Sequence, residues 1–279
     1  MLNVTIYVIF MIKYTCKKEE TVLNSSIKSL FIQGYYGWKV ILNILIYIAF
    51  FAYVLYLIIE APKFSTKILY LFILVIVLGT CLYYEYLKQL YHRMVGLLIN
   101  DCDPIKAWQS ANLLTKRDIF KGFKGSLKIF NVLLLMDEGH YEECRRYLTN
   151  EDQFFRASID NIFIKYHSEL QLAWLLNDPE LGNSAMKGLN KIRNTNRKKY
   201  SPLFSWDEID GLHCYINDRY SKALTYLNHV DISKLNSREQ TYLNVLIADT
   251  YRKAGKTNEI GSHLQTAKEL GNKLAIINH

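Results

Sequence analysis

Two long runs of uncharged residues stand near the beginning of the chain and differ from everything that follows. VILNILIYIAFFAYVLYLII fills positions 40–59, and ILYLFILVIVLGTCLYY fills positions 68–84. An α-helix rises about 1.5 Å per residue, so about twenty apolar residues match a hydrocarbon core of roughly 30 Å. In lipid, only helices and closed barrels satisfy their own backbone. The runs therefore predict two transmembrane helices, about 40–59 and 67–86, within a segment 39–86. The alternative is a pair of buried core helices in a soluble protein.

The charges beside these runs predict how the helices lie in a membrane. Five lysines precede the first run and five Lys or Arg stand between positions 88 and 117, whereas the connecting loop EAPKFSTK carries two lysines. Cytoplasmic flanks of membrane helices are enriched in Lys and Arg, and Trp and Tyr gather at headgroup level. Such aromatic residues flank the runs at Tyr35, Tyr36, Trp38, Tyr83, Tyr84 and Tyr86. We expect an integral protein of a bacterial plasma membrane with both termini in the cytoplasm, and residues 1–38 as a cytoplasmic or interfacial segment.

From residue 87 to 279 the pattern is that of helical hairpins at a regular spacing. Turns between helices are indicated at Cys102, Gly139, Asn177, Asp218 and Gly255, which step by 37, 38, 41 and 37 residues. The residue five places after each turn is in most cases small, and a small residue there lets the two helices of a hairpin approach closely. Asp103-Pro104, Asp178-Pro179 and Ser201-Pro202 each place a capping side chain before a proline, which favours a helix start. The sequence therefore predicts an all-α protein with about five hairpins after the membrane segment.

These residues resemble the tetratricopeptide-repeat (TPR) family. The resemblance covers roughly residues 88 to 272 and is best in GLHCYINDRYSKALTYL and IADTYRKAGKTNEIGSHLQTA. Its repeat-defining positions are Ala107, Gly139, Cys144, Gly182, Gly211, Ala223, Ala248, Tyr251, Gly255 and Ala267. The spacing exceeds the usual 34 residues, and Ile260 stands where the family has Ala. The resemblance implies an α-solenoid that binds other proteins. The alternative is an irregular helical bundle.

Charge is distributed in a way that argues against nucleic acid as a partner. Residues 1–99 carry nine Lys or Arg against four Asp or Glu, and the remaining residues carry 25 against 22, so most of the net charge of +8 lies beside the apolar runs. Two basic clusters remain. Arg117, Lys121, Lys124 and Lys128 are spaced as one helix face, and the segment 191–199 contains Arg193, Arg197, Lys198 and Lys199. Either could contact anionic lipid, at about 1 kcal/mol per cation, or an acidic partner. An ordinary solvated surface is the alternative for both.

Candidate catalytic chemistry finds little support in the sequence. AGKTNE has the tail of a phosphate-binding loop, but Thr250 stands where the upstream glycine belongs and a helix, not a strand, precedes it. The five cysteines lack the paired spacing of a zinc site. We therefore expect no catalytic residue, metal, cofactor or small-molecule substrate. The leading hypothesis is a membrane-anchored, cytoplasm-facing TPR-like scaffold that recruits a protein partner. The alternatives are a membrane-surface or envelope-assembly factor that binds anionic lipid, and an enzyme with an unrecognised site.

Overall fold

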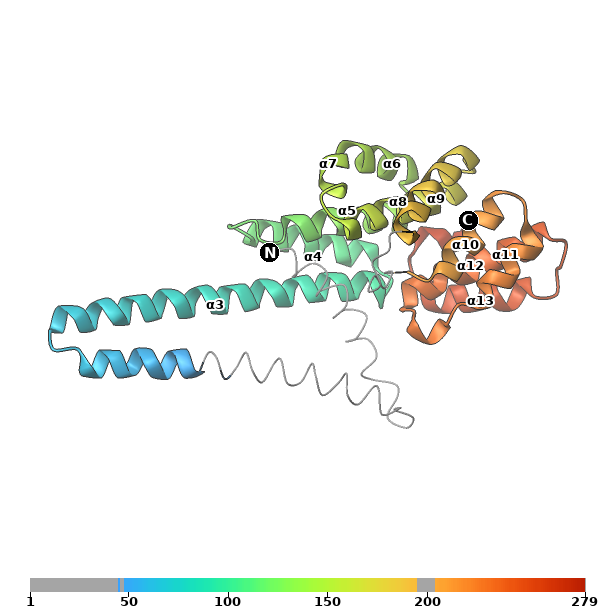
Figure 1. Cartoon of the computed structure of the whole chain (residues 1–279). Helices are drawn as coiled ribbons and strands as arrows, with labels where there is room; N and C mark the ends of the chain where they lie inside the picture. Colours follow the sequence, from blue (N-terminus) through green and yellow to red (C-terminus); the bar gives the residue numbers. More distant parts are fainter. Residues whose placement is uncertain (1–44, 46–47, 195–203, 279) are drawn as a thin grey trace. The chain divides into compact units, whose positions relative to one another are not determined.

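A computed structural model describes residues 45, 48–194 and 204–278 of the chain (Figure 1). All regular elements in these residues are helices, which confirms the predicted all-α class. The chain divides into two compact units, one that ends at Gln89 and one that begins at Leu90. Residues 1–38, which the sequence assigns to an interfacial segment, lie outside the described residues.

The unit that ends at Gln89 contains a helical hairpin. Helix Ile48–Glu60 is followed by a short turn and by α3 (Phe64–Ile99). In the described part of the chain, α3 is the one helix that is long and apolar enough to cross a membrane, and 6% of its most apolar window is buried. The helix Ile48–Glu60 is shorter than a span, and residues 40–44, 46 and 47 of the first predicted span are outside the described residues.

The helix that contains the second predicted span, 67–86, extends beyond it at both ends. It begins at Phe64, because the Lys63 carbonyl accepts hydrogen bonds from the N–H groups of Thr66 and Lys67 at 3.1 and 3.2 Å and so includes them in the first turn. It also continues past Tyr86 to Ile99, since no helix-breaking residue stands between them. The low burial of its apolar side chains is unlike that of a soluble core helix.

The unit that begins at Leu90 is built from consecutive helices. After the end of α3 these are α4 (Pro104–Arg117), α5 (Lys124–Asp137), α6 (Tyr141–Asn150), α7 (Asp152–Phe155), α8 (Ile159–Leu175), α9 (Pro179–Arg193), α10 (Trp206–Ile216), α11 (Tyr220–Leu227), the 3₁₀ turn η2 (Ile232–Lys234), α12 (Ser237–Lys253), α13 (Ile260–Gly271) and η3 (Ala275–Asn278). Helices α5 and α6, α8 and α9, α10 and α11, and α12 and α13 pack as neighbours along the chain, and the row α8, α10 and α12 packs side by side (Figure 1).

The turns of these hairpins share one backbone conformation. All five positions that the spacing indicates have positive φ, namely Cys102 (49°), Gly139 (81°), Asn177 (53°), Asp218 (58°) and Gly255 (72°). Glycine adopts positive φ at little cost, and Asn and Asp do so more readily than other residues. In the last four turns the following N–H donates to the carbonyl five residues back, as in His140 to Leu135 at 2.8 Å and Lys256 to Tyr251 at 3.0 Å. This is the Schellman ending of a helix, repeated four times.

Small residues allow the two helices of a hairpin to pack closely. A Cβ on Gly211 of α10 would lie 2.7 Å from Cδ2 of Leu227 in α11, and one on Gly182 of α9 would lie 3.2 Å from Cβ of Ala173 in α8. The predicted positions Ala107, Cys144, Ala223, Ala248 and Ala267 are all buried, and Tyr251 is half-buried. Asp103 and Asp178 accept hydrogen bonds from the backbone N–H groups of Lys106 and Leu181, as expected of helix caps. Ser201 and Pro202 lie outside the described residues, and α10 begins instead at Trp206, where Ser205 is the cap.

The end of the chain lies against the first turns of the same unit. The Lys273 ammonium is 2.7 Å from Oδ2 of Asp103, and the Lys273 backbone N–H donates to the Cys102 carbonyl at 3.2 Å. Nearby, η3 packs on α5, α12 and α13. Helix α12 is the central element, since residues 241–250 are all buried. The helices therefore close on themselves, and among the described residues side chains fill the inner face that an open solenoid would offer to a partner.

Candidate functional site

A buried ion pair joins the first part of the helical array to the last. Asp137 ends α5 and Arg238 lies at the start of α12, with exposed fractions of 0% and 4%. The Nε of Arg238 donates to both carboxylate oxygens, at 2.9 and 2.7 Å, and the Tyr242 hydroxyl donates to Oδ1 at 2.8 Å. The guanidinium also lies 4.6 Å from the centre of the Tyr242 ring. This cluster is enclosed by α5 and α12, so we assign it to stability and not to ligand binding.

The electrostatics of this pair explain why neither charge can be removed alone. Burial raises the pKa of Asp137, while the facing guanidinium opposes that shift. Burial alone would lower the pKa of Arg238, but the Asp137 carboxylate reverses the direction and raises it. Nη2 of Arg238 has no hydrogen-bond partner and is buried. A buried charge that loses its partner is costly, so each residue depends on the other.

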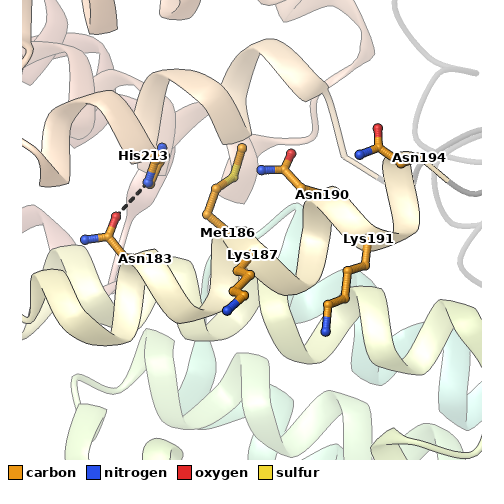
Figure 2. A pocket seen from close by; sticks show the side chains of 7 residues that line it. All are labelled: Asn183, Met186, Lys187, Asn190, Lys191, Asn194 and His213. Atoms are coloured by element: carbon orange, nitrogen blue, oxygen red, sulfur yellow. Dashed lines mark hydrogen bonds between the residues drawn. The ribbon is translucent and has the colours of Figure 1, made fainter.

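An open hollow lies between α9 and α10 and is lined by several polar side chains (Figure 2). Its volume is about 370 Å³, and it is lined by Asn183, Met186, Lys187, Asn190, Lys191, Asn194 and His213. Five of these seven residues come from α9, and Asn194 is the residue that follows its last turn. The polar ones among these six are spaced at steps of four, three, one and three, which places them on one helix face. Met186 is the buried apolar residue among them.

The chemistry of the hollow suits an acidic segment of a chain. Oδ1 of Asn183 accepts hydrogen bonds from Nε2 of His213 at 2.8 Å and from Nδ2 of Asn217 at 3.2 Å, so these three side chains hold one another in place. Burial, and then the charge of Arg219, lower the pKa of His213, which keeps its ring neutral at neutral pH. The lining has two lysines and no carboxylate. Amide groups both donate and accept hydrogen bonds, so Asn190 and Asn194 could pair with a peptide backbone.

The first basic cluster does not form the single helix face that its spacing predicts. Arg117 is the last residue of α4 and Lys124 is the first of α5, while Lys121 lies in the loop between them with a φ of 55°. The helix ends there because the Asp118 carboxylate accepts hydrogen bonds from the N–H groups of Gly122 and Phe123, at 2.9 and 2.8 Å. These bonds offer the backbone an alternative to helix.

Two of the predicted contact residues take part in interactions within the chain. Lys128 forms an ion pair with Glu151, and its ammonium lies 5.1 Å from the centre of the Phe154 ring. Arg193 donates to Asp210 at 2.9 Å and lies 4.0 Å from the centre of the Trp206 ring. Arg197, Lys198 and Lys199 lie outside the described residues. Sequence reasoning missed Lys187 and the asparagines of α9, although their spacing along one helix face was a signal that could have found them.

Comparisons with known proteins add no relative to this picture. No family model matches the chain, and searches of curated proteins and of solved structures gave no match either. Within the described residues, no group of three or more His, Cys, Asp or Glu side chains is arranged to hold a metal ion. The candidate site therefore rests on the geometry of the α9–α10 hollow alone.

Proposed function

We propose that this chain is a membrane-anchored, TPR-like scaffold that recruits a protein partner through an acidic segment bound at the α9–α10 hollow. The observation that carries the proposal is the lining of that hollow, which contains two lysines and two asparagines on one face of α9, the following Asn194, and no carboxylate. Complementary charge favours an acidic partner and excludes basic ones. In this proposal the protein binds and does no covalent chemistry.

Two further observations support the anchor and the repeat. The helix α3 has the length and composition of a membrane span, and its apolar side chains are exposed. Equivalent turns at Gly139, Asn177, Asp218 and Gly255 share both positive φ and the same pair of backbone hydrogen bonds. The proposed orientation, with the array in the cytoplasm, rests on the excess of lysine and arginine beside the apolar runs.

The closed array changes where a partner would bind. Because the inner positions around α12 are filled, a partner would have to bind an outer surface, and the hollow is such a surface. Its open shape is unlike the enclosed pockets that usually hold small molecules. An extended segment of a protein fits this surface better than a metabolite does.

Affinity capture of the tagged full-length chain from native membranes tests this function, with a matched pair of charge-reversal variants. Lys187→Glu combined with Lys191→Glu reverses the charge of the hollow, whereas Lys253→Glu combined with Lys256→Glu makes the same change on exposed lysines outside the lining. A stoichiometric protein that is captured by wild type and by the second variant, but lost with the first, is the expected result. A partner that survives the first variant would contradict the assigned surface, and no protein partner at all would contradict the scaffold.

A further inference from the structure

Exposed large apolar side chains are concentrated on one part of the unit that begins at Leu90. Among its described residues, six such side chains are exposed: Ile105, Trp108, Leu113, Ile119, Phe120 and Ile232. Five of the six belong to α4 or to the loop that follows it. The two in the loop are the most exposed, with fractions of 75% for Ile119 and 77% for Phe120. A local concentration of this kind marks a surface that contacts something other than water.

The loop that displays Ile119 and Phe120, residues 118–123, has a defined structure. The carboxylate of Asp118 accepts the N–H groups of Gly122 and Phe123, and the Phe123 ring packs on Tyr91 with 5.4 Å between ring centres. Asp118 and Phe123 are buried, at 7% and 5% exposure. Its two ends are thus fixed while its two apolar residues face outward. We call residues 118–123 the α4–α5 loop.

The exposed charged residues next to this loop in the sequence are all positive. Lys116, Arg117, Lys121 and Lys124 are exposed, and the one carboxylate between positions 113 and 127 is the buried Asp118. Because Asp118 is buried and hydrogen-bonded to the backbone, it adds little negative charge at the surface. A pair of apolar residues surrounded by cations complements the interface of a membrane that contains anionic lipid.

Chain connectivity keeps the loop near any membrane that α3 enters. Phe123 contacts Tyr91, and Tyr91 follows Tyr86, the last residue of the predicted span, by five residues. Even a fully extended chain covers at most about 18 Å in five residues, at roughly 3.6 Å each. The α4–α5 loop therefore stays within reach of the headgroups, whereas Ile232 has no such restraint in sequence.

We propose that the α4–α5 loop is a second membrane contact, in which Ile119 and Phe120 enter the cytoplasmic leaflet while Lys116, Arg117, Lys121 and Lys124 contact anionic headgroups. This inference rests on the proposed anchoring by α3, and it adds a lipid-binding site separate from the α9–α10 hollow. Such a contact fixes the helical array at the membrane surface in addition to the covalent connection through α3.

Photolabelling of the full-length chain in vesicles tests the contact. The vesicles contain phosphatidylcholine with phosphatidylglycerol and a trace of phospholipid with a photoreactive group near the head of its acyl chain. Trypsin, which cuts after Arg117 and Lys121, releases residues 118–121 as a separate peptide for mass spectrometry. The expected result is labelling of this peptide as well as of peptides from α3. Labelled α3 with unlabelled 118–121 would overturn the inference and leave the anchor intact, whereas unlabelled α3 would overturn the anchor itself.

Variants test whether labelling of the 118–121 peptide depends on the apolar and cationic side chains of the proposed contact. Ile119→Ser combined with Phe120→Ser should abolish labelling of the 118–121 peptide, while Ile232→Ser, at an exposed apolar residue elsewhere, should leave it unchanged. Lys116→Gln combined with Lys124→Gln, which keeps the tryptic sites at Arg117 and Lys121, should lower labelling about fivefold for each lysine in anionic vesicles. Equal labelling of wild type in vesicles of pure phosphatidylcholine would overturn the role of the cations. A photoreactive residue placed at position 120 provides a further test in native membranes. If it cross-links to a protein while the 118–121 peptide is not labelled by lipid in vesicles, the loop contacts a protein partner and the inference is overturned.

Discussion

Helix α12 and the first part of α3 contrast sharply in how their sequences relate to their surroundings. Helix α12 has the polar sequence SREQTYLNVLIADTYRK, yet residues 241–250 are all buried. The apolar helix α3 has no charged residue between Lys67 and Glu85, yet only 6% of its most apolar window is buried. In a protein surrounded by water, the apolar helix would be expected to be buried and the polar helix to be exposed.

Hydrogen bonds explain the burial of α12. Thr241 and Thr250 donate to carbonyls four residues back at 2.8 and 2.6 Å, Asn244 does so at 2.8 Å, and Arg238 is paired with Asp137. Buried polar groups are tolerated when they are bonded in this way. Nothing comparable explains the exposure of α3 in water, whereas a lipid environment does. We therefore propose that α12 is adapted to a protein interior and the apolar part of α3 to lipid.

The largest effect is expected from charges placed in the middle of α3. Val75 and Leu78 are 60% and 47% exposed. Val75→Lys combined with Leu78→Lys should cost roughly 5–7 kcal/mol of membrane insertion, since a lysine near the centre of a span costs about 2.5–3.5 kcal/mol. Density-gradient flotation of the full-length chain should show the variant leaving the membrane fraction. The control is Ile232→Lys, at a residue 52% exposed in the other unit, which should float as wild type does. Identical flotation of both would contradict the membrane role of α3.

A somewhat smaller effect is expected at the buried ion pair. Asp137→Asn leaves the Arg238 charge buried without its counter-ion, which costs roughly 3–5 kcal/mol. For a domain of this size, that lowers Tm by about 10 °C, measured by thermal unfolding of the purified full-length chain.

A double variant keeps this prediction specific to charge. Asp137→Leu combined with Arg238→Met removes both charges and should recover most of the lost Tm, because well-packed apolar pairs replace buried ion pairs at little cost. If Asp137→Asn unfolds within about 2 °C of wild type, the ion pair between α5 and α12 does not contribute to the stability of the helical array.

The position of the turns could be predicted from the sequence, but the closure of the array could not. The turns are indicated by residue types that tolerate positive φ, at Gly139, Asn177, Asp218 and Gly255, so residue type and spacing alone were sufficient to predict them. Asp137 and Arg238 are 101 residues apart, and no local pattern pairs them. The basic cluster was misassigned to one helix face, because its spacing is helical while the Asp118 side chain ends the helix inside it.

A moderate effect is expected where hairpin helices touch. A Cβ on Gly211 would lie 2.7 Å from both Cγ and Cδ2 of the buried Leu227, so Gly211→Ala should destabilise the fold by about 1–3 kcal/mol. Gly261 is also helical but has no atom within 4 Å of the added Cβ. Gly261→Ala should therefore stabilise by roughly 0.5–1 kcal/mol through helix propensity. Denaturant unfolding measures the free energy of unfolding of both variants. If the two substitutions change it by the same amount and in the same direction, the close helix contact at Gly211 is unimportant.

The smallest effect is expected from two histidines. Burial lowers the pKa of both His213 and His263 below the ordinary value of about 6.5. Because the folded state binds these protons less well than the unfolded state does, stability present above pH 6.5 is lost as the pH falls toward the folded values. His213→Gln with His263→Gln should thus reduce the loss of Tm between pH 7 and pH 5. The same substitution at the exposed His229 is the control, and an unchanged pH dependence in the double variant would contradict the shift.

Alkaline extraction of native membranes that contain the wild-type full-length chain tests most directly whether α3 lies in lipid. High pH strips proteins that are held only at the surface and leaves those with a membrane-spanning helix in the pellet. Retention in the pellet is the predicted result. Release of the chain into the soluble fraction would contradict it and would require another explanation for the exposed apolar surface of α3.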